Sequence, residues 1–219
     1  YPGSDDAEYV YVYGGPHTDP TGDYKSEASV ANIYDAAAYR ESNLKIDGSR
    51  GNTVEFWLKK DGYDVTKTEK EVLFDAVVLG TTTGDDDYGR LRIEIDNASA
   101  TPFRVSYTSG SEGIELSPIG SSAITANSIS DGKWHHYSFT FKCETALDAS
   151  LYVDGVFDDK RTHAQVLGSV DGNIVATIGS LASSTKAAGS AAIGYGKLTG
   201  SLDEFRFWKT ARTAKQIGD

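Results

Sequence analysis

Short segments of alternating apolar and polar residues, separated by turn-forming residues, run through most of this chain and constrain its fold more than any other feature. Successive side chains on a β-strand point to opposite faces, so this alternation is typical of strands with one buried face. The pattern favours an all-β fold of antiparallel sheets, either a sandwich or a barrel. We expect strands at Glu8–Tyr13, Thr53–Lys59, Val72–Leu79, Gly89–Asp96, Phe103–Thr108, Trp134–Cys143, Ser150–Asp154, Ile174–Ile178, Ala191–Gly194 and Ser201–Trp208.

The remaining local signals are one tight turn and two short helices. Asp154-Gly155 accepts the positive φ values of a two-residue turn, so Leu151–Phe157 is predicted to be a hairpin. Helical turns are predicted at Ser29–Arg40 and at Thr213–Ile217, the second stopped by Gly218. No structureless linker divides the chain, so we expect one domain over residues 26–219. Residues 1–25 form a lead-in segment that adds an edge strand in one interpretation.

Length and charge limit the partners. A chain of 219 residues buries a large core without disulfides, and the lone Cys143 is expected to be a buried thiol. With 21 Lys and Arg against 32 Asp and Glu, the net charge of −11 argues against nucleic acid. No segment approaches the roughly 18 apolar residues of a membrane span. The chain has no methionine and begins with Tyr1, so we expect it to be processed or cut from a longer protein.

Several segments, in order, carry a family resemblance. Asp131–Tyr137, Leu151–Gly155, Ile178-Gly179 and Gly200–Trp208 resemble the laminin-G-like, concanavalin-A-like lectin and glucanase jelly-roll family. Upstream, Thr53–Lys59 and Glu71–Leu79 look like its early core strands, so the resemblance covers about Leu44 to Ile217. It implies two packed antiparallel sheets and a binding or adhesion function, frequently toward glycans and often with calcium.

A minority of such relatives hydrolyse polysaccharides, which needs two carboxylates across the scissile bond. The resemblance implies a Glu-x-Asp-x-x-Glu strand signature for them. The nearest match here is Glu94-Ile95-Asp96, and the third acid is missing. We therefore expect no catalytic residues and no enzyme activity.

Aromatic side chains are the main candidates for ligand binding. Alternation places Val54, Phe56 and Leu58 in the core and Trp57 on the opposite side, where it either covers the sheet or forms a platform for a sugar ring. Tyr9, Tyr11 and Tyr13 share one face of a predicted strand. They stack sugar rings, contact a neighbouring subunit, or pack onto the same domain.

Asp203 is the candidate metal ligand. Simple alternation puts Asp203 on the same face as Phe205 and Phe207, so its carboxylate is predicted to point into the sandwich. A buried carboxylate needs a partner, either backbone amides of a facing loop or a calcium ion. The run Asp85–Asp87 is a second acidic cluster, interpreted as solvated with a metal site as the alternative.

These observations favour a non-catalytic recognition or adhesion domain that binds a glycan or glycoprotein. We expect it to belong to a larger protein that is extracellular or displayed on a cell or virion surface. One alternative is a structural module of a multi-subunit assembly, such as a phage or viral particle, with neighbouring subunits as partners. A divergent glycoside hydrolase is the other alternative.

Overall fold

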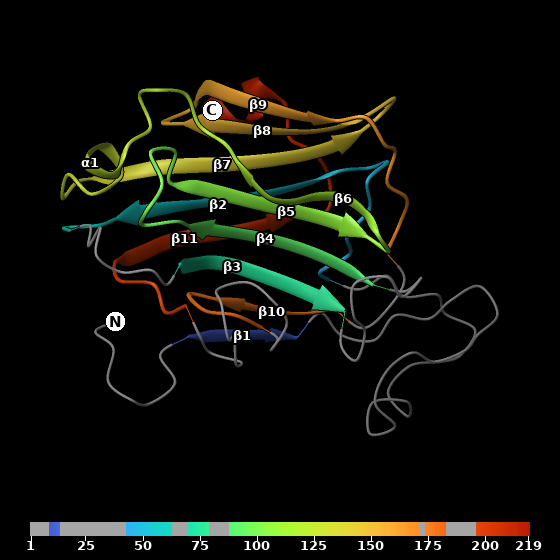
Figure 1. Ribbon diagram of the computed structural model, residues 1–219, viewed down its shortest axis with the longest axis horizontal. Coiled ribbons are helices and arrows are strands. Elements are labelled where there is room, and N and C mark those ends of the chain that lie inside the picture. The colour runs from blue at the N-terminus through green and yellow to red at the C-terminus, as the bar shows by residue number, and fades with distance from the viewer. Residues whose placement is uncertain (1–8, 14–42, 63–69, 79–87, 171–173, 183–195) are drawn as a thin grey trace.

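Eleven strands form two antiparallel sheets that pack face to face (Figure 1). The computed structural model describes residues 9–13, 43–62, 70–78, 88–170, 174–182 and 196–219, and the strands and helices named below lie within these ranges. The prediction of an all-β, two-sheet sandwich is confirmed. The two sheets differ in what their outer faces carry, and this difference positions the candidate site.

The six-stranded sheet has the order β1-β10-β3-β4-β5-β6. Each neighbouring pair is antiparallel, and β1 is an edge strand on β10. Its strands are β1 (Val10–Tyr13), β3 (Glu71–Val78), β4 (Gly89–Ile95), β5 (Phe103–Ser109), β6 (Glu112–Pro118) and β10 (Ile174–Ile178).

The five-stranded sheet has the order β11-β2-β7-β8-β9. Its long central pair, β2 with β7, runs in unbroken register from Asn52↔Phe141 to Lys59↔Trp134. Its strands are β2 (Asn52–Lys59), β7 (Trp134–Cys143), β8 (Leu147–Val153), β9 (Val156–His163) and β11 (Ser201–Trp208).

The core lies between the sheets and is rich in aromatic rings. Phe56 of β2 stacks on Phe139 of β7 and on Phe205 of β11, with ring centroids 6.1 and 6.0 Å apart. Phe103 of the opposite sheet meets Phe139 edge-on at 5.4 Å. Contacts of this kind join the two sheets directly, and Cys143 is buried at the edge of this core, as predicted.

The outer face of the six-stranded sheet is also buried at its central strands β3 and β4, although it carries charges there. Every residue of β3 and β4 is buried. Asp75 accepts hydrogen bonds from Nε and Nη2 of Arg90 at 2.8 and 2.7 Å, and from the backbone N–H of Ala182 at 2.9 Å. Burial of a charged group is tolerated when it is paired in this way.

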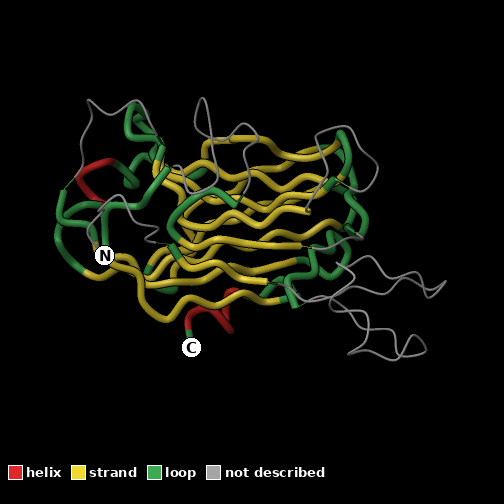
Figure 2. The backbone as a smooth tube through the Cα atoms, turned by 90° about the horizontal axis from the view of Figure 1, so that it is seen from below, coloured by secondary structure: helices red, strands yellow, loops and turns green. Residues whose placement is uncertain are grey.

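Two short helices complete the described part of the chain: α1 (Ala126–Ile129) and α2 (Ala214–Gly218). Helix α2 begins with a capping box, in which Thr213 accepts from the Gln216 N–H and Gln216 accepts from the Thr213 N–H. Figure 2 shows α2 beside the C-terminus, on the outside of the strand layers. No helix among the described residues is long and apolar enough to cross a membrane.

Nine of the ten predicted strands lie where the structure has strands, but two strands were not predicted: β6, and β9 beyond its first two residues, which belong to the predicted hairpin. The 112–118 segment carries no strand signal in the sequence, because Ile114 is the only fully buried residue of β6 and no apolar alternation marks it. The predicted strand Ala191–Gly194 and helix Ser29–Arg40 lie outside the described residues, as does the acidic run Asp85–Asp87. The 151–157 hairpin is confirmed, with φ of +50° at Asp154 and +79° at Gly155.

Candidate functional site

A groove of about 430 Å³ lies on the outer face of the five-stranded sheet. Strands β2 and β7 form its floor, β11 borders one side, and the β8–β9 turn with α2 borders the other. The floor residues are Glu55, Trp57 and His136, the turn residues are Asp154 and Gly155, β11 gives Glu204 and Arg206, and the segment with α2 gives Arg212 and residues 216–219.

Trp57 is the exposed aromatic residue of the floor. It is 38% exposed, whereas its neighbours Phe56 and Leu58 are fully buried in the core. Trp57 pairs with His136 across the β2–β7 ladder, and the two rings lie 5.4 Å apart between centroids. The predicted outward orientation of Trp57 is therefore correct, and its partly exposed ring lies beside His136 at an interplanar angle of 46°.

Glu55, two residues before Trp57, organises the groove floor. Its side chain is only 1% exposed, and its two oxygens lie 2.7 and 2.6 Å from Nη1 of Arg212. Trp208 Nε1 also donates to it at 3.1 Å, and the Arg212 guanidinium lies 4.8 Å from the Trp208 ring centroid. This cluster ties β2, β11 and the segment before α2 together.

Helix α2 is held against the β8–β9 turn by close backbone contact. A Cβ added at Gly155 would lie 3.1 Å from Cα of Gly218, so the turn and the end of the helix approach more closely than larger residues allow. Arg212 also donates to the backbone carbonyl of Gln216. The wall of the groove is therefore fixed on both of its sides.

Asp154 joins the turn to two adjacent histidines. It accepts from the backbone N–H of His136 at 2.9 Å and lies 2.8 Å from Nδ1 of His135. The hydrogen bond with Asp154 raises the pKa of His135 above its usual value, against a smaller opposing effect of burial. Burial lowers the pKa of His136, the cross-strand neighbour of Trp57, below its usual value.

The three tyrosines lie away from this groove. Tyr11 is 51% exposed on β1, at the edge of the other sheet, and Tyr9 just before that strand is half-buried. Tyr13 ends β1, and its side chain lies outside the described residues. The structure thus does not bring the tyrosines and Trp57 into one site, and ligand binding by either group stays a prediction.

The predicted inward orientation of Asp203 is wrong. Asp203 pairs with Trp57 and Arg206 with Glu55, so β11 has one more residue than β2 between these pairs. This β-bulge, with φ of +46° at Glu204, shifts the alternation and leaves Asp203 on the outer face.

The exposed Asp203 carboxylate accepts from the backbone N–H of Glu204 at 2.8 Å. The calcium ion was inferred because a buried carboxylate needs a partner, and Asp203 is not buried. That argument for a calcium ion therefore no longer holds. Among the described residues no three His, Cys, Asp or Glu side chains gather as a metal site. A calcium ion at Asp203 stays an untested prediction.

The acid pair Glu94 and Asp96 belongs to the other sheet. Glu94 is fully buried, lies 3.1 Å from Arg92 Nε and 3.3 Å from Lys70 Nζ, and makes these ion pairs without well-aligned hydrogen bonds. Burial raises the pKa of Glu94. Asp96 accepts from Arg104 Nε at 3.3 Å. Both acids are engaged in structural pairs.

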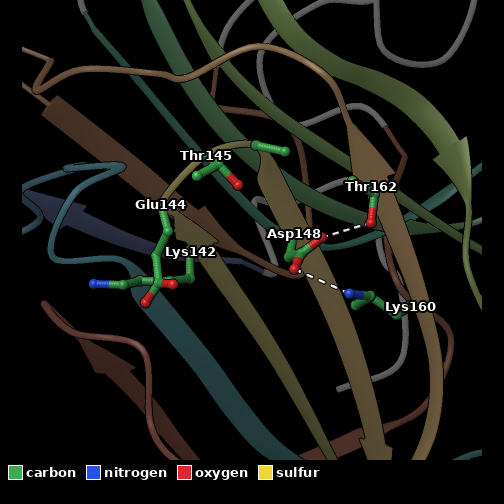
Figure 3. A pocket seen from close by; sticks show the side chains of 7 residues that line it. Lys142, Glu144, Thr145, Asp148, Lys160 and Thr162 are labelled. Atoms are coloured by element: carbon green, nitrogen blue, oxygen red, sulfur yellow. Dashed lines mark hydrogen bonds and ion pairs between the residues drawn. The ribbon is translucent and has the colours of Figure 1, made fainter.

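A second hollow of about 390 Å³ lies farther along the same outer face, at the opposite end of β7, β8 and β9 (Figure 3). Asp148 stands at its centre and accepts from Thr162 Oγ1 at 2.5 Å and from Lys160 Nζ at 3.0 Å. No aromatic ring lines it among the described residues. It offers less to a ligand than the groove at Trp57.

Sequence reasoning missed Arg206, Arg212 and Asp154 as groove residues. Alternation does place Glu55 on the same face of its strand as Trp57, and His136 on the same face as Ser138. This was the available signal that Glu55 and His136 point outward. What alternation cannot supply is which positions of distant strands stand opposite each other. That alignment depends on the 57↔136 and 55↔206 pairings.

Solved structures with a similar fold include three different kinds of protein. A pentraxin from Limulus polyphemus is 14% identical over 80% of this chain and 71% of its own, with a TM-score of 0.43. The binding domain of botulinum neurotoxin serotype D is 11% identical over 82% of this chain and 37% of its own, with a TM-score of 0.48. Domains LG4–5 of the mouse laminin α1 chain are 15% identical over 75% of this chain and 36% of their own, with a TM-score of 0.46. No curated protein sequence matches significantly.

The family assignment comes from the sequence profile of laminin G-type domains. This profile, described as the concanavalin A-like lectin/glucanases superfamily, matches residues 34–218. The match spans both sheets and every strand that forms the groove. The chain therefore belongs to the concanavalin A-like lectin/glucanases superfamily.

Proposed function

We propose that this chain is a non-catalytic carbohydrate-recognition domain of a larger protein, displayed outside the cell or on a virion, and that the sugar lies on Trp57. The observation that carries the proposal is a partly exposed aromatic ring that lies beside His136 inside a polar groove. Membership of a superfamily that includes lectins agrees with this assignment.

The groove chemistry suits a sugar ring. A pyranose presents a face of C–H groups that packs on an aromatic ring, and a rim of hydroxyls that both donate and accept hydrogen bonds. Trp57 supplies the apolar face. Around it Arg206 is a donor, while Asp154 and Glu204 are acceptors, and all three are held by neighbouring residues.

We infer a non-catalytic function because three groove carboxylates are each held in an ion pair: Glu55 with Arg212, Glu204 with Arg206 and Asp154 with His135. Hydrolysis of a glycosidic bond needs one carboxyl group as acid and another as nucleophile or base. Both carboxylate oxygens of Glu55 accept hydrogen bonds from Arg212, and one of them also accepts from Trp208 Nε1. Release of reducing ends from any polysaccharide, lost in Glu94→Ala or Glu55→Ala, would instead support a hydrolase.

A glycan array tests the proposal. The protein is clustered on a multivalent support, because sugar binding per site is weak, and is applied in millimolar calcium and again in EDTA. We expect selective binding that Trp57→Ala abolishes. Phe157→Ala is the matched control, since Phe157 is 52% exposed on the same face but lies outside the groove.

The outcomes separate the ligand from the metal. Equal binding by wild type and Trp57→Ala, or a blank array, would refute the groove as a sugar site. Binding lost in EDTA and in Asp203→Asn would support a calcium ion at Asp203. Equal binding in calcium and EDTA would refute that ion.

A structural module in an assembly is the second candidate. It is favoured by edge strand β1, where Val10 and Tyr11 are 57% and 51% exposed. A sheet edge with apolar side chains can add a strand from another subunit. Sedimentation as an oligomer that Tyr11→Lys dissociates would support this candidate, and a monomer at all concentrations would count against self-assembly.

A further inference from the structure

The three tryptophans of the chain all lie on the outer face of the five-stranded sheet. Trp57, Trp134 and Trp208 are 38%, 43% and 37% exposed. Trp208 has a structural partner on each side, since its N–H donates to Glu55 and the Arg212 guanidinium covers its ring. Trp134 makes no ring contact with any described side chain, although it is the most exposed of the three.

Strand register makes Trp134 the diagonal neighbour of Trp57. Lys59 pairs with Trp134 and Trp57 pairs with His136, so the two indoles occupy consecutive rows of one face. Diagonal neighbours on adjacent antiparallel strands are roughly 7–8 Å apart, which is comparable to the length of one or two sugar units. The two rings can therefore contact different sugars of one chain.

The rows continue from Trp134 through Trp57 into the groove. The next row holds Glu55 with Arg206, and rows of one face succeed each other at about 7 Å. From Trp134 to the Glu55 row is thus about 14 Å, longer than a single sugar ring. We call the three rows of Trp134, Trp57 and Glu55 the track. A ligand that contacts the whole track is an oligosaccharide.

The charged side chains of the track favour an uncharged oligosaccharide. The track's two arginines are already paired, Arg212 with Glu55 and Arg206 with Glu204 at 2.5 Å, and Lys59, opposite Trp134, lies 3.9 Å from Asp61. Asp154 adds a further carboxylate at the rim of the groove, and the protein has a net charge of −11. A sulfated or carboxylated sugar would meet excess negative charge, whereas a neutral sugar finds donors and acceptors.

We propose that Trp134 and Trp57 are two stacking subsites for one extended, uncharged oligosaccharide that runs along β2 and β7 into the groove. This inference rests on the proposed function, because it assumes that Trp57 binds sugar. It adds the length of the ligand, its lack of charge and a second binding residue.

The test uses oligosaccharides of one to six units. The probes are β-1,4-linked glucose, xylose and mannose series, a β-1,3-linked glucose series and a heparin-derived hexasaccharide as the sulfated comparison. Calorimetry and tryptophan fluorescence measure affinity for wild type, Trp57→Ala and Trp134→Ala. Melting midpoints check folding, and Trp134→Leu serves as a second variant that keeps an apolar side chain without the ring.

We expect affinity to rise with length in at least one neutral series. Both Trp134 variants should lower the affinity for the hexamer by about tenfold, since roughly 50 Å² of ring face loses its contact with the ligand. They should leave the affinity for the monomer unchanged, whereas Trp57→Ala should weaken binding at every length. Trp134→Tyr should restore part of the hexamer affinity.

Three results would overturn the inference. If Trp134 variants bind every length as wild type does while Trp57→Ala fails to bind, the second subsite is wrong and the proposed function stands. If the heparin hexasaccharide binds more tightly than all neutral hexamers, the lack of charge is wrong. If wild type binds none of the sugars, the proposed function itself fails.

Discussion

Replacement of Arg212 by Met should destabilise the fold far more than replacement of the other groove arginine. Arg212 neutralises Glu55, whose side chain is 1% exposed, and removing it leaves a buried carboxylate with only the Trp208 N–H and a 3.4 Å contact from Ser138 Oγ. Breaking a buried ion pair from one side costs about 3–5 kcal/mol.

The lower end of that range applies here. The Arg212 side chain is 19% exposed, so water can reach the vacated space and solvate part of the Glu55 charge. The methionine keeps the apolar stem over Trp208 but loses the cation–π contact. We therefore expect a loss of about 3 kcal/mol in the free energy of unfolding.

Urea unfolding monitored by fluorescence measures this loss. With a slope of about 2 kcal/mol per molar, the midpoint should fall by about 1.5 M without a change of slope. The control is Arg206→Met, because Arg206 and Glu204 are 52% and 55% exposed and such pairs contribute less than about 1 kcal/mol.

A double variant identifies the cause. Glu55→Gln with Arg212→Met removes the unpaired charge while the Gln carbonyl still accepts from Trp208, so it should be more stable than Arg212→Met alone. An Arg212→Met protein no less stable than Arg206→Met would refute the reasoning. It would mean that solvent screens Glu55 despite its burial.

Three further measurements test the turn, a histidine and the core. Gly155→Ala should cost about 1–2 kcal/mol in urea unfolding because of its φ of +79°, whereas Gly168→Ala, where an added Cβ meets open space, should be nearly neutral; equal costs would contradict this account. NMR titration should give His135 a pKa above 6.5 that falls in Asp154→Asn. Because the folded-state pKa is raised, this pair's contribution to stability is complete below pH 6.5 and is lost as the pH rises through the folded pKa; an unchanged pKa in the variant would refute the role of Asp154. Burial raises the pKa of the Cys143 thiol, so it should react slowly with a thiol reagent in the folded protein and rapidly in urea, and fast reaction without urea would contradict its burial.

The strands with strong apolar alternation could be predicted from the sequence. Val54, Phe56 and Leu58 of β2 are buried on one face, and alternation alone assigns them there. β6 could not be predicted, because Gly113 and Leu116 both have positive φ, at +124° and +49°, which interrupts the regular pleat of the strand. A strand without regular alternation is held by its neighbour β5 rather than by a pattern of its own.

The bulge in β11 shows why a site is harder to predict than a strand. One extra residue between Asp203 and Arg206 reverses the side on which Asp203 lies, while Phe205 and Phe207 stay against the core. Nothing local in the segment marks the bulge. It arises from the pairing with β2, so the orientation of a single acid depended on a partner strand more than 140 residues away in sequence.

The two outer faces of the sandwich differ in how deeply their charged side chains are buried, and this difference favours one face for the proposed ligand. On the six-stranded sheet Asp75, Arg90, Arg92 and Glu94 are each at most 3% exposed. Any ligand there would have to displace covering residues and separate buried ion pairs, at a cost of several kcal/mol.

On the five-stranded sheet the buried charge is confined to Glu55 and its partner, while aromatic rings remain exposed above it. Glu55 thus works as a support: its hydrogen bonds hold Trp208 and Arg212, and Arg212 in turn holds the wall formed by α2. Trp57 lies on the same strand, two residues along, with His136 beside it on β7. A rigid support beside an exposed ring would let the proposed sugar bind without ordering the protein first, and for this reason the proposed binding face is the five-stranded sheet.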